Sequence, residues 1–237
     1  MSADVVSHVL ERIPFELDVP ELLRQARVKP GSEMADELLE LAAAASQLAQ
    51  PKALYLVAYV SARGEDYVEV EGRRFTSRVL RVNLEQAHRV YPYLATCGWE
   101  LHQWAEGIAD PLQRYWADVL KQLALVHALR TLDEHIATMY APGDTSAMNP
   151  GSLPDWPIEQ QAALFDLLGA AVQAIGVQLT ASMLMIPNKT VSGIRFPTTA
   201  HFESCQLCPR ENCPGRRTPF DSTLSSTKYA ATSHHVA

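Results

Sequence analysis

Three of the four cysteines lie within nine residues near the C-terminus, spaced as Cys205-x2-Cys208-x4-Cys213. Most of their neighbours are polar, charged or proline, so little apolar surface is available for these thiols to pack against as small hydrophobes. Thiolates are soft ligands that select zinc, copper(I) or iron–sulfur clusters. The spacing therefore predicts that Cys205, Cys208 and Cys213 are metal ligands.

The residues leave the kind of metal centre open. Structural zinc takes four ligands, and the candidates for the fourth are His201, Glu203, Glu211 and, if the fold brings it close, Cys97. A [4Fe-4S] cluster accepts three cysteines and one other ligand or an open iron. A proline after Cys208 and after Cys213, and the nearby positive charge of Arg210, Arg216 and Arg217, favour the cluster. An iron–sulfur cluster is the first hypothesis and zinc is the second. The third is a redox dithiol, or no function for these cysteines.

Composition indicates where such a centre would work. The 237 residues are 47% hydrophobic, which suffices for one large globular domain or for a domain with an appendage. A net charge of -7 argues against a surface built to bind nucleic-acid phosphates, so cofactor and protein partners are expected. We find no signal-peptide pattern and no apolar run of membrane-spanning length, and expect a cytoplasmic protein. In a reducing compartment, clustered cysteines indicate metal binding rather than disulfides.

The elements that would position these residues follow from periodicity and turn signals. Residues 1–50 are expected to be mainly helical, and strands are expected at 54–60, 67–72, 78–82 and 90–98. Asp110, Pro111 and Gln113 predict the start of a long helix that reaches about Met139. A proline- and glycine-rich loop at 141–157, a helix at 158–177 and paired strands at 179–187 and 190–196 follow.

Strands in the middle of the chain, with helices before and after them, predict an α+β fold on a largely antiparallel sheet. We divide the chain into an N-terminal helical segment (1–50), an α+β domain (51–200), a cysteine-rich metal or cluster loop (201–221) and a flexible tail (222–237).

Three segments resemble one known family. They are the strand and helix pair from residue 90, the Pro150-Gly151 loop with its following helix, and the motifs Leu179-Thr180-x-Ser182 and Val191-Ser192-Gly193. Together they resemble the activation domain of cobalamin-dependent methionine synthase over about residues 90–196. That domain binds S-adenosylmethionine and presents it to the corrinoid for reductive reactivation, so the resemblance implies the same fold, ligand and partner.

The resemblance also implies a ligand site at Asn149, Pro150, Gly151, Ser152, Trp156, Ser192 and Gly193. Glycine in this loop lets the backbone approach a ligand closely, and the proline holds the approach rigid. The chain departs from the family at Ala147 and Ser152, where the family has an arginine and a tyrosine. It also places Val126 or His127 where the family's long helix supplies an acid. Replacement contacts would have to come from Arg130, Asp144 or Asp155.

Two main functions follow from these features. The first is an accessory protein of corrinoid-dependent methyl transfer, which reactivates a separate cobalamin-bearing protein or methyltransferase with the help of its iron–sulfur cluster. The alternative is a non-catalytic module that recognises a corrinoid protein and carries a structural zinc. A methyltransferase with an unrelated acceptor is a third reading, for which we find no acid, base or nucleophile constellation and no Gly-x-Gly-x-x-Gly loop.

Overall fold

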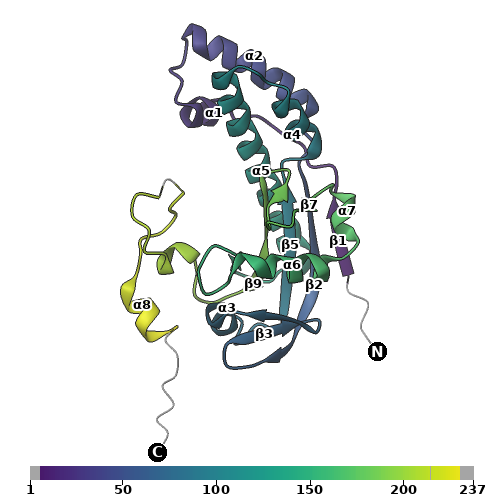
Figure 1. Cartoon of the computed structure of the whole chain (residues 1–237), viewed down its shortest axis with the longest axis vertical. Coiled ribbons are helices and arrows are strands. Elements are labelled where there is room, and N and C mark those ends of the chain that lie inside the picture. The colour runs from purple at the N-terminus through teal and green to yellow at the C-terminus, as the bar shows by residue number, and fades with distance from the viewer. Residues whose placement is uncertain (1–5, 214, 230–237) are drawn as a thin grey trace, which may run out of the picture.

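The computed structural model describes residues 6–213 and 215–229. Its centre is an antiparallel sheet of seven strands with the order β4-β3-β2-β5-β9-β6, and β1 also pairs with β2 (Figure 1). The strands are β1 (Val6–Leu10), β2 (Lys52–Arg63), β3 (Tyr67–Val70), β4 (Arg73–Thr76), β5 (Arg89–Thr96), β6 (Thr145–Met148) and β9 (Thr190–Pro197). The prediction of an α+β fold on an antiparallel sheet is confirmed.

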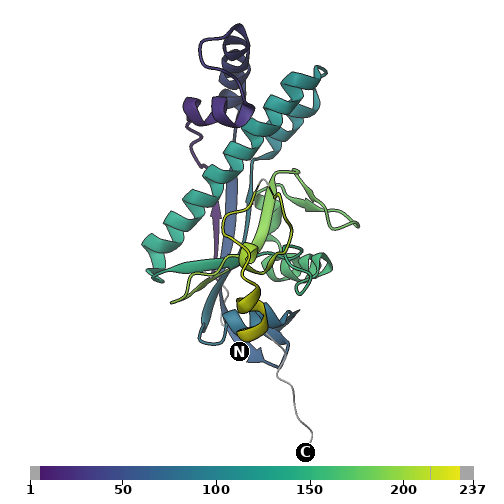
Figure 2. The same cartoon turned by 90° about the vertical axis from the view of Figure 1, so that its left-hand side faces the viewer.

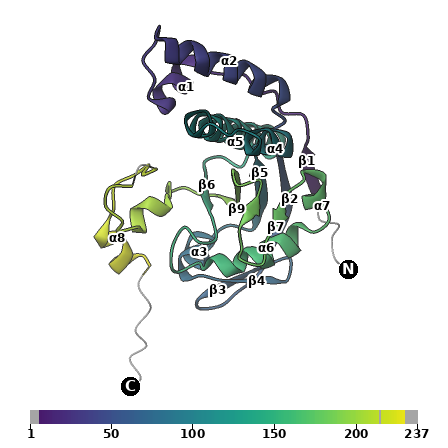
Figure 3. The same cartoon turned by 45° about the horizontal axis from the view of Figure 1, so that its top comes forward.

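Both faces of the sheet are buried, as the long apolar run of β2 requires. Successive side chains of a strand point to opposite faces. Ala53, Tyr55 and Val57 therefore pack on one side with helix α5 (Pro111–Tyr140). Leu54 and Leu56 pack on the other side with α6 (Gln161–Leu168) and α7 (Ala171–Ala174). Figure 3 shows the strands between these two helical layers.

The long helix α5 (Pro111–Tyr140) links the sheet to a separate helical cluster. Asp110 caps its start by accepting a hydrogen bond from the Gln113 N–H at 2.9 Å, and Pro111 occupies the first turn, as predicted. The second half of α5 lies across the sheet, and the first half packs against α1 (Val19–Ala26), α2 (Glu33–Leu48) and α4 (Trp99–Glu106). Figure 2 shows α5 running diagonally across both.

Two local predictions differ from the structure. In one case a side chain caps a helix, and in the other a distant strand pairs with the segment. Residues 78–82, predicted as a strand, lie in helix α3 (Arg78–Asn83), since the Ser77 hydroxyl accepts from the Leu80 N–H at 3.0 Å and caps a helix. The N-terminal segment, predicted as mainly helical, contains helices α1 and α2, but its described part begins with strand β1, which pairs with the first half of β2.

The region after α5 differs most from the expected elements. The predicted loop contains β6, which pairs with β9. Segment 179–187 does not pair with 190–196: β7 (Gln178–Leu179) pairs with β8 (Met185–Ile186), and β9 lies between β5 and β6. The predicted helix is divided into η1 (Ile158–Gln160), α6 (Gln161–Leu168) and α7 (Ala171–Ala174). α6 ends at Gly169, whose positive φ of 59° interrupts the helix before α7.

The C-terminal segment folds back onto the domain through η2 (Ser204–Leu207) and α8 (Ser222–Thr227). A flexible tail was expected from residue 222, but the described part is docked. The ring centroids of Tyr229 and Phe202 lie 5.8 Å apart, and the Tyr229 hydroxyl donates to Asn83 Oδ1 at 2.7 Å. Residues 230–237 of the predicted tail lie outside the described residues. Within the described ranges, no helix is both long and apolar enough to cross a membrane.

Candidate functional site

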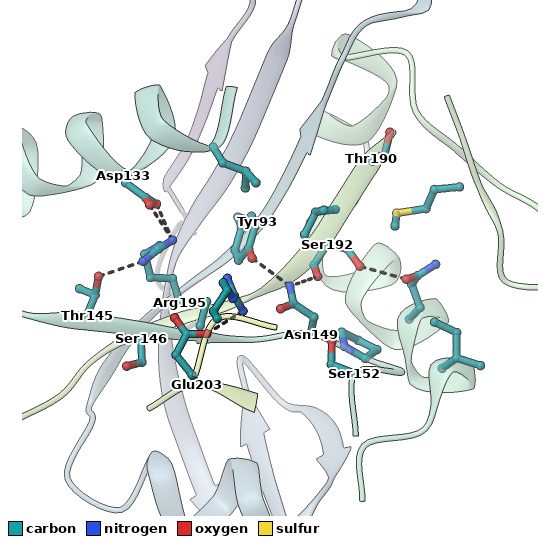
Figure 4. Close-up of a pocket in the computed structure, with 18 of the residues that line it drawn as sticks. Tyr93, Asp133, Thr145, Ser146, Asn149, Ser152, Thr190, Ser192, Arg195 and Glu203 are labelled. Atoms are coloured by element: carbon teal, nitrogen blue, oxygen red, sulfur yellow. Dashed lines mark hydrogen bonds and ion pairs between the residues drawn. The ribbon is translucent and has the colours of Figure 1, made fainter. Parts of the chain in front are cut away.

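A cavity of about 590 Å³ opens where β6 ends beside β9. β6 pairs with β9 from Ile194 to Pro197 only. The edge of β9 from Thr190 to Gly193 therefore continues past the end of β6, and the cavity lies there (Figure 4). Its walls come from α5, β5, the loop after β6, α6 and the segment that begins at His201. A cavity of this size is typical of small-molecule sites.

Asn149 fixes the uncharged end of this cavity. Its Nδ2 donates to the Tyr93 hydroxyl at 2.9 Å and to the Ser192 carbonyl oxygen at 2.6 Å. Both amide hydrogens are thereby used, which leaves the side-chain oxygen to accept from another group. Gly193 is required beneath this amide, because a Cβ there would meet Asn149 Nδ2 and the Met148 carbonyl oxygen, each at 2.5 Å.

Ser192 and Gln161 form a second polar pair in the wall of this cavity. The Ser192 hydroxyl donates to Gln161 Oε1 at 3.0 Å, and Gln161 Nε2 donates to the Met183 carbonyl oxygen at 2.9 Å. Both Ser192 and Gln161 are buried. Because these buried groups satisfy one another, this wall is rigid and presents a defined polar surface.

The other end of the cavity is charged. Arg195 Nη2 lies 2.6 Å from Asp133 Oδ1, and its Nη1 donates to the Thr145 hydroxyl at 3.0 Å. The Arg195 side chain is 14% exposed, and its buried Nε has no hydrogen-bond partner among the described atoms. Burial raises the pKa of Asp133 to about 6, although the charge of Arg195 opposes this rise. Asp133 and Thr145 therefore hold the Arg195 guanidinium in a fixed position in the cavity wall.

A second ion pair comes from the C-terminal segment. Arg217 Nη2 lies 2.7 Å from Glu203 Oε2, and His201 Nε2 lies 3.5 Å from Glu203 Oε1. All three residues line the cavity. The segment predicted to be a separate cysteine-rich loop therefore forms part of the cavity wall.

The structure gathers four of the seven predicted ligand residues around the cavity. Asn149, Pro150, Ser152 and Ser192 line it. The other three, Gly151, Trp156 and Gly193, lie behind the lining residues. The Gly151 N–H donates to the Trp156 carbonyl oxygen at 2.8 Å, and the Trp156 ring is fully buried against Phe75. These three residues shape the loop and the sheet, and ligand binding by the set stays a prediction.

Sequence reasoning missed the ion pair of Arg195 and Asp133, and it named Glu203 and Arg217 only in connection with the metal centre. Arg195 stands directly opposite Ala147 across β6 and β9, and Asp133 projects from α5. The replacements considered from the sequence lie elsewhere. Arg130 pairs with Glu134 on the exposed side of α5, Asp155 accepts from the Val79 N–H at the start of α3, and Asp144 lines a different cavity. Recognising Arg195 from sequence would have required the register of β6, which was expected to be a loop.

The cysteine segment is ordered around an arginine. Arg216 Nη1 donates to the Cys205 carbonyl oxygen and Nη2 to the Cys208 carbonyl oxygen, both at 3.1 Å. Hydrogen bonds from the backbone N–H groups of Arg217 and Thr218 lower the pKa of the Cys205 thiol.

The described side chains do not form a ready metal site. Over residues 6–213 and 215–229, no group of three or more His, Cys, Asp or Glu side chains is placed to hold a metal ion. Cys97 is fully buried with the helical cluster of α1, α2 and α4, whereas Cys208 packs against the opposite core. The role of Cys205, Cys208 and Cys213 as metal ligands stays a prediction, and we assign no chemical step to a metal centre.

Comparison with known proteins supports the fold. No protein-family model matches the chain, and no curated protein matches it. The chain is similar to a solved structure, the MetH reactivation domain bound to AdoHcy, with a TM-score of 0.59 and 16% sequence identity. The match covers 85% of this chain and 82% of that one. The fold is therefore that of a methionine synthase reactivation domain.

Proposed function

We propose that this protein binds an S-adenosyl ligand in the cavity beside β9 and assists the reductive reactivation of a corrinoid protein. The observation that carries the proposal is the cavity itself. It combines a fixed amide at Asn149 with a largely buried arginine at Arg195, on a fold similar to that of a solved domain that holds AdoHcy. The nucleoside end of an S-adenosyl ligand suits the Asn149 amide, and its amino-acid carboxylate suits Arg195.

The departure at Ala147 has a specific compensation. The resemblance implies an arginine there that binds the ligand carboxylate, and Arg195 lies directly across the strand pair from this position. Cross-strand partners place their side chains on the same face of the sheet, close together. Arg195 therefore supplies a guanidinium to the same cavity from the neighbouring strand, and charge-assisted pairing with a carboxylate suits this group.

The reaction would be completed on a separate partner. When bound, S-adenosylmethionine supplies a methyl group from its sulfonium to the reduced corrinoid of that partner, and S-adenosylhomocysteine is left in the cavity. The protein's own residues would bind and orient this ligand. The electron for the corrinoid has to come from a reductant, and the cysteine segment is where we predict a [4Fe-4S] cluster, with zinc as the alternative.

Calorimetry and absorbance spectroscopy test this proposal. The full chain is titrated with S-adenosylmethionine and S-adenosylhomocysteine, and then mixed under anaerobic conditions with a cobalt(II) corrinoid protein and a chemical reductant. Conversion to the methylated corrinoid should require this protein, S-adenosylmethionine and the reductant together. Conversion that proceeds equally well without the protein would refute the reactivation role.

The second candidate is a module that recognises a corrinoid protein and has no catalytic function, with a structural zinc that holds its C-terminal loop. The observation that favours it is that Arg195 is already paired with Asp133, so a ligand carboxylate has to compete for it. This candidate predicts about one zinc per chain, binding to a corrinoid protein and no heat on titration with either S-adenosyl ligand.

A further inference from the structure

The charged residues that line the cavity indicate which end of the ligand would bind there. Among its described lining residues, the carboxylates and the lysine or arginine side chains are Asp133, Glu203, Arg195 and Arg217. We propose that the C-terminal segment completes the binding site, with Glu203 and Arg217 recognising the zwitterionic amino-acid end of the ligand. The inference rests on the proposed function and identifies which part of the ligand this segment binds.

The segment is attached to the sheet, so its side chains have a fixed relation to the cavity. The Phe202 N–H donates to the Ser146 hydroxyl on β6 at 2.9 Å, and the Phe202 ring is 3% exposed in the core. The next residue, Glu203, is held by its own N–H, which donates to Gln206 Oε1 at 3.0 Å. The position of Glu203 is therefore fixed by the buried Phe202 before it and by the hydrogen bond to Gln206 after it in the chain.

Arg217 combines a held backbone with an accessible side chain. The adjacent Arg216 ties the loop together, because its guanidinium donates to the carbonyl oxygens of Cys205 and Cys208. The Arg217 side chain is 64% exposed and contacts Glu203. The Arg217 guanidinium can therefore redirect some of its N–H donors from Glu203 to an incoming carboxylate while its backbone stays in place.

The balance of charge selects the class of ligand. Two carboxylates and two guanidinium groups surround the charged end, so a phosphate or another polyanion would meet two like charges there. An α-amino acid group matches both signs: its ammonium suits Glu203 and Asp133, and its carboxylate suits Arg217 and Arg195. Like-charge contacts give specificity by penalising the wrong ligand. The uncharged end at Asn149 and Ser192 is then left for the nucleoside.

Two ligands that differ in this end test the inference. S-adenosylhomocysteine carries the amino-acid group, and 5′-methylthioadenosine lacks it. We expect wild-type protein to bind the first about tenfold or more tightly than the second, which corresponds to one or two charge-assisted contacts. R217Q and E203Q should weaken S-adenosylhomocysteine binding about tenfold and change 5′-methylthioadenosine binding less than about twofold.

The controls separate this inference from the proposal on which it rests. R210Q alters an exposed arginine of the same loop that does not line the cavity, and it should bind both ligands as the wild type does. R217K keeps the charge without the fork and should fall between wild type and R217Q if the side chain acts as we infer. Equal weakening of both ligands in R217Q and E203Q, or no effect on either, overturns the inference while S-adenosyl binding stands. Failure of the wild type to bind either ligand overturns both.

Discussion

Ala147 on β6 and Arg195 on β9 are direct partners across an antiparallel strand pair. The activation-domain resemblance places an arginine at position 147, and in this chain the guanidinium reaches the cavity from the opposing strand. Moving the arginine from one strand to its partner keeps the positive charge at the cavity and changes only the strand that carries it. Under the proposed function, Arg195 takes the part of the arginine that the resemblance implies at position 147.

The exchange predicts the behaviour of a rescue variant. R195A should weaken S-adenosylhomocysteine binding about 100-fold, because it removes charged hydrogen bonds to the ligand carboxylate. The double variant A147R/R195A returns a guanidinium to the family's position and should recover binding to within about tenfold of wild type. Calorimetry measures both. A double variant no better than R195A would show that the two positions are not equivalent.

Loss of Arg195 should also destabilise the folded protein. R195A leaves the partly buried carboxyl of Asp133 without its ion-pair partner, and removing one member of such a pair is costly. We expect a melting temperature lower than that of wild type by several degrees at pH 8, with part of the loss recovered in R195A/D133N. If the double variant is less stable than R195A alone, the unpaired carboxyl is not the cause.

Asp133 gives a pH dependence with a definite sign. Its pKa is raised in the folded protein from 3.8 to about 6, mainly by burial. Between these values the folded state binds more protons than the unfolded state, so the contribution of Asp133 to stability falls as pH rises from about 4 to about 6. Urea unfolding of wild type and D133N across this range should give a difference that changes in that direction. A constant difference would contradict the raised pKa.

Gly193 should be intolerant of even one methyl group. G193A would bring a Cβ to 2.5 Å from both Asn149 Nδ2 and the Met148 carbonyl oxygen, so the Asn149 amide must move. Such overpacking costs about 1–3 kcal/mol of unfolding free energy, and we expect weaker binding of both S-adenosylhomocysteine and 5′-methylthioadenosine. G215A is the matched control, since no atom lies within 4 Å of a Cβ there. Equal stability of the two variants would contradict the packing described for Gly193.

The cysteine prediction is tested by metal content. Protein purified anaerobically from an iron-replete host should contain iron and absorb in the visible range if a cluster forms, or hold about one zinc per chain if it does not. Removing Cys205, Cys208 and Cys213 together should abolish the metal, whereas C97A should retain it because Cys97 packs in a different core. Metal-free wild-type protein would refute both forms of the site.

Sequence patterns predicted the elements that depend on local signals. The capped start of α5 and the apolar run of β2 were found because each is determined by a few adjacent residues. The pairing of β6 with β9 was missed, since a four-residue strand such as Thr145–Met148 carries little pattern and gains its partner only from the fold. For the same reason the sequence indicated the Asn149 loop but not Arg195 or Asp133, which come together from a strand and a helix far apart in the chain.

The most direct test of the central claim is a calorimetric titration of the full chain with S-adenosylhomocysteine, with R195A titrated alongside. The account predicts one site per chain with a Kd in the micromolar range for wild type, corresponding to about -8 kcal/mol, and a loss of most of that affinity in R195A. Absence of binding by the wild type up to millimolar ligand, or equal binding by R195A, would contradict it.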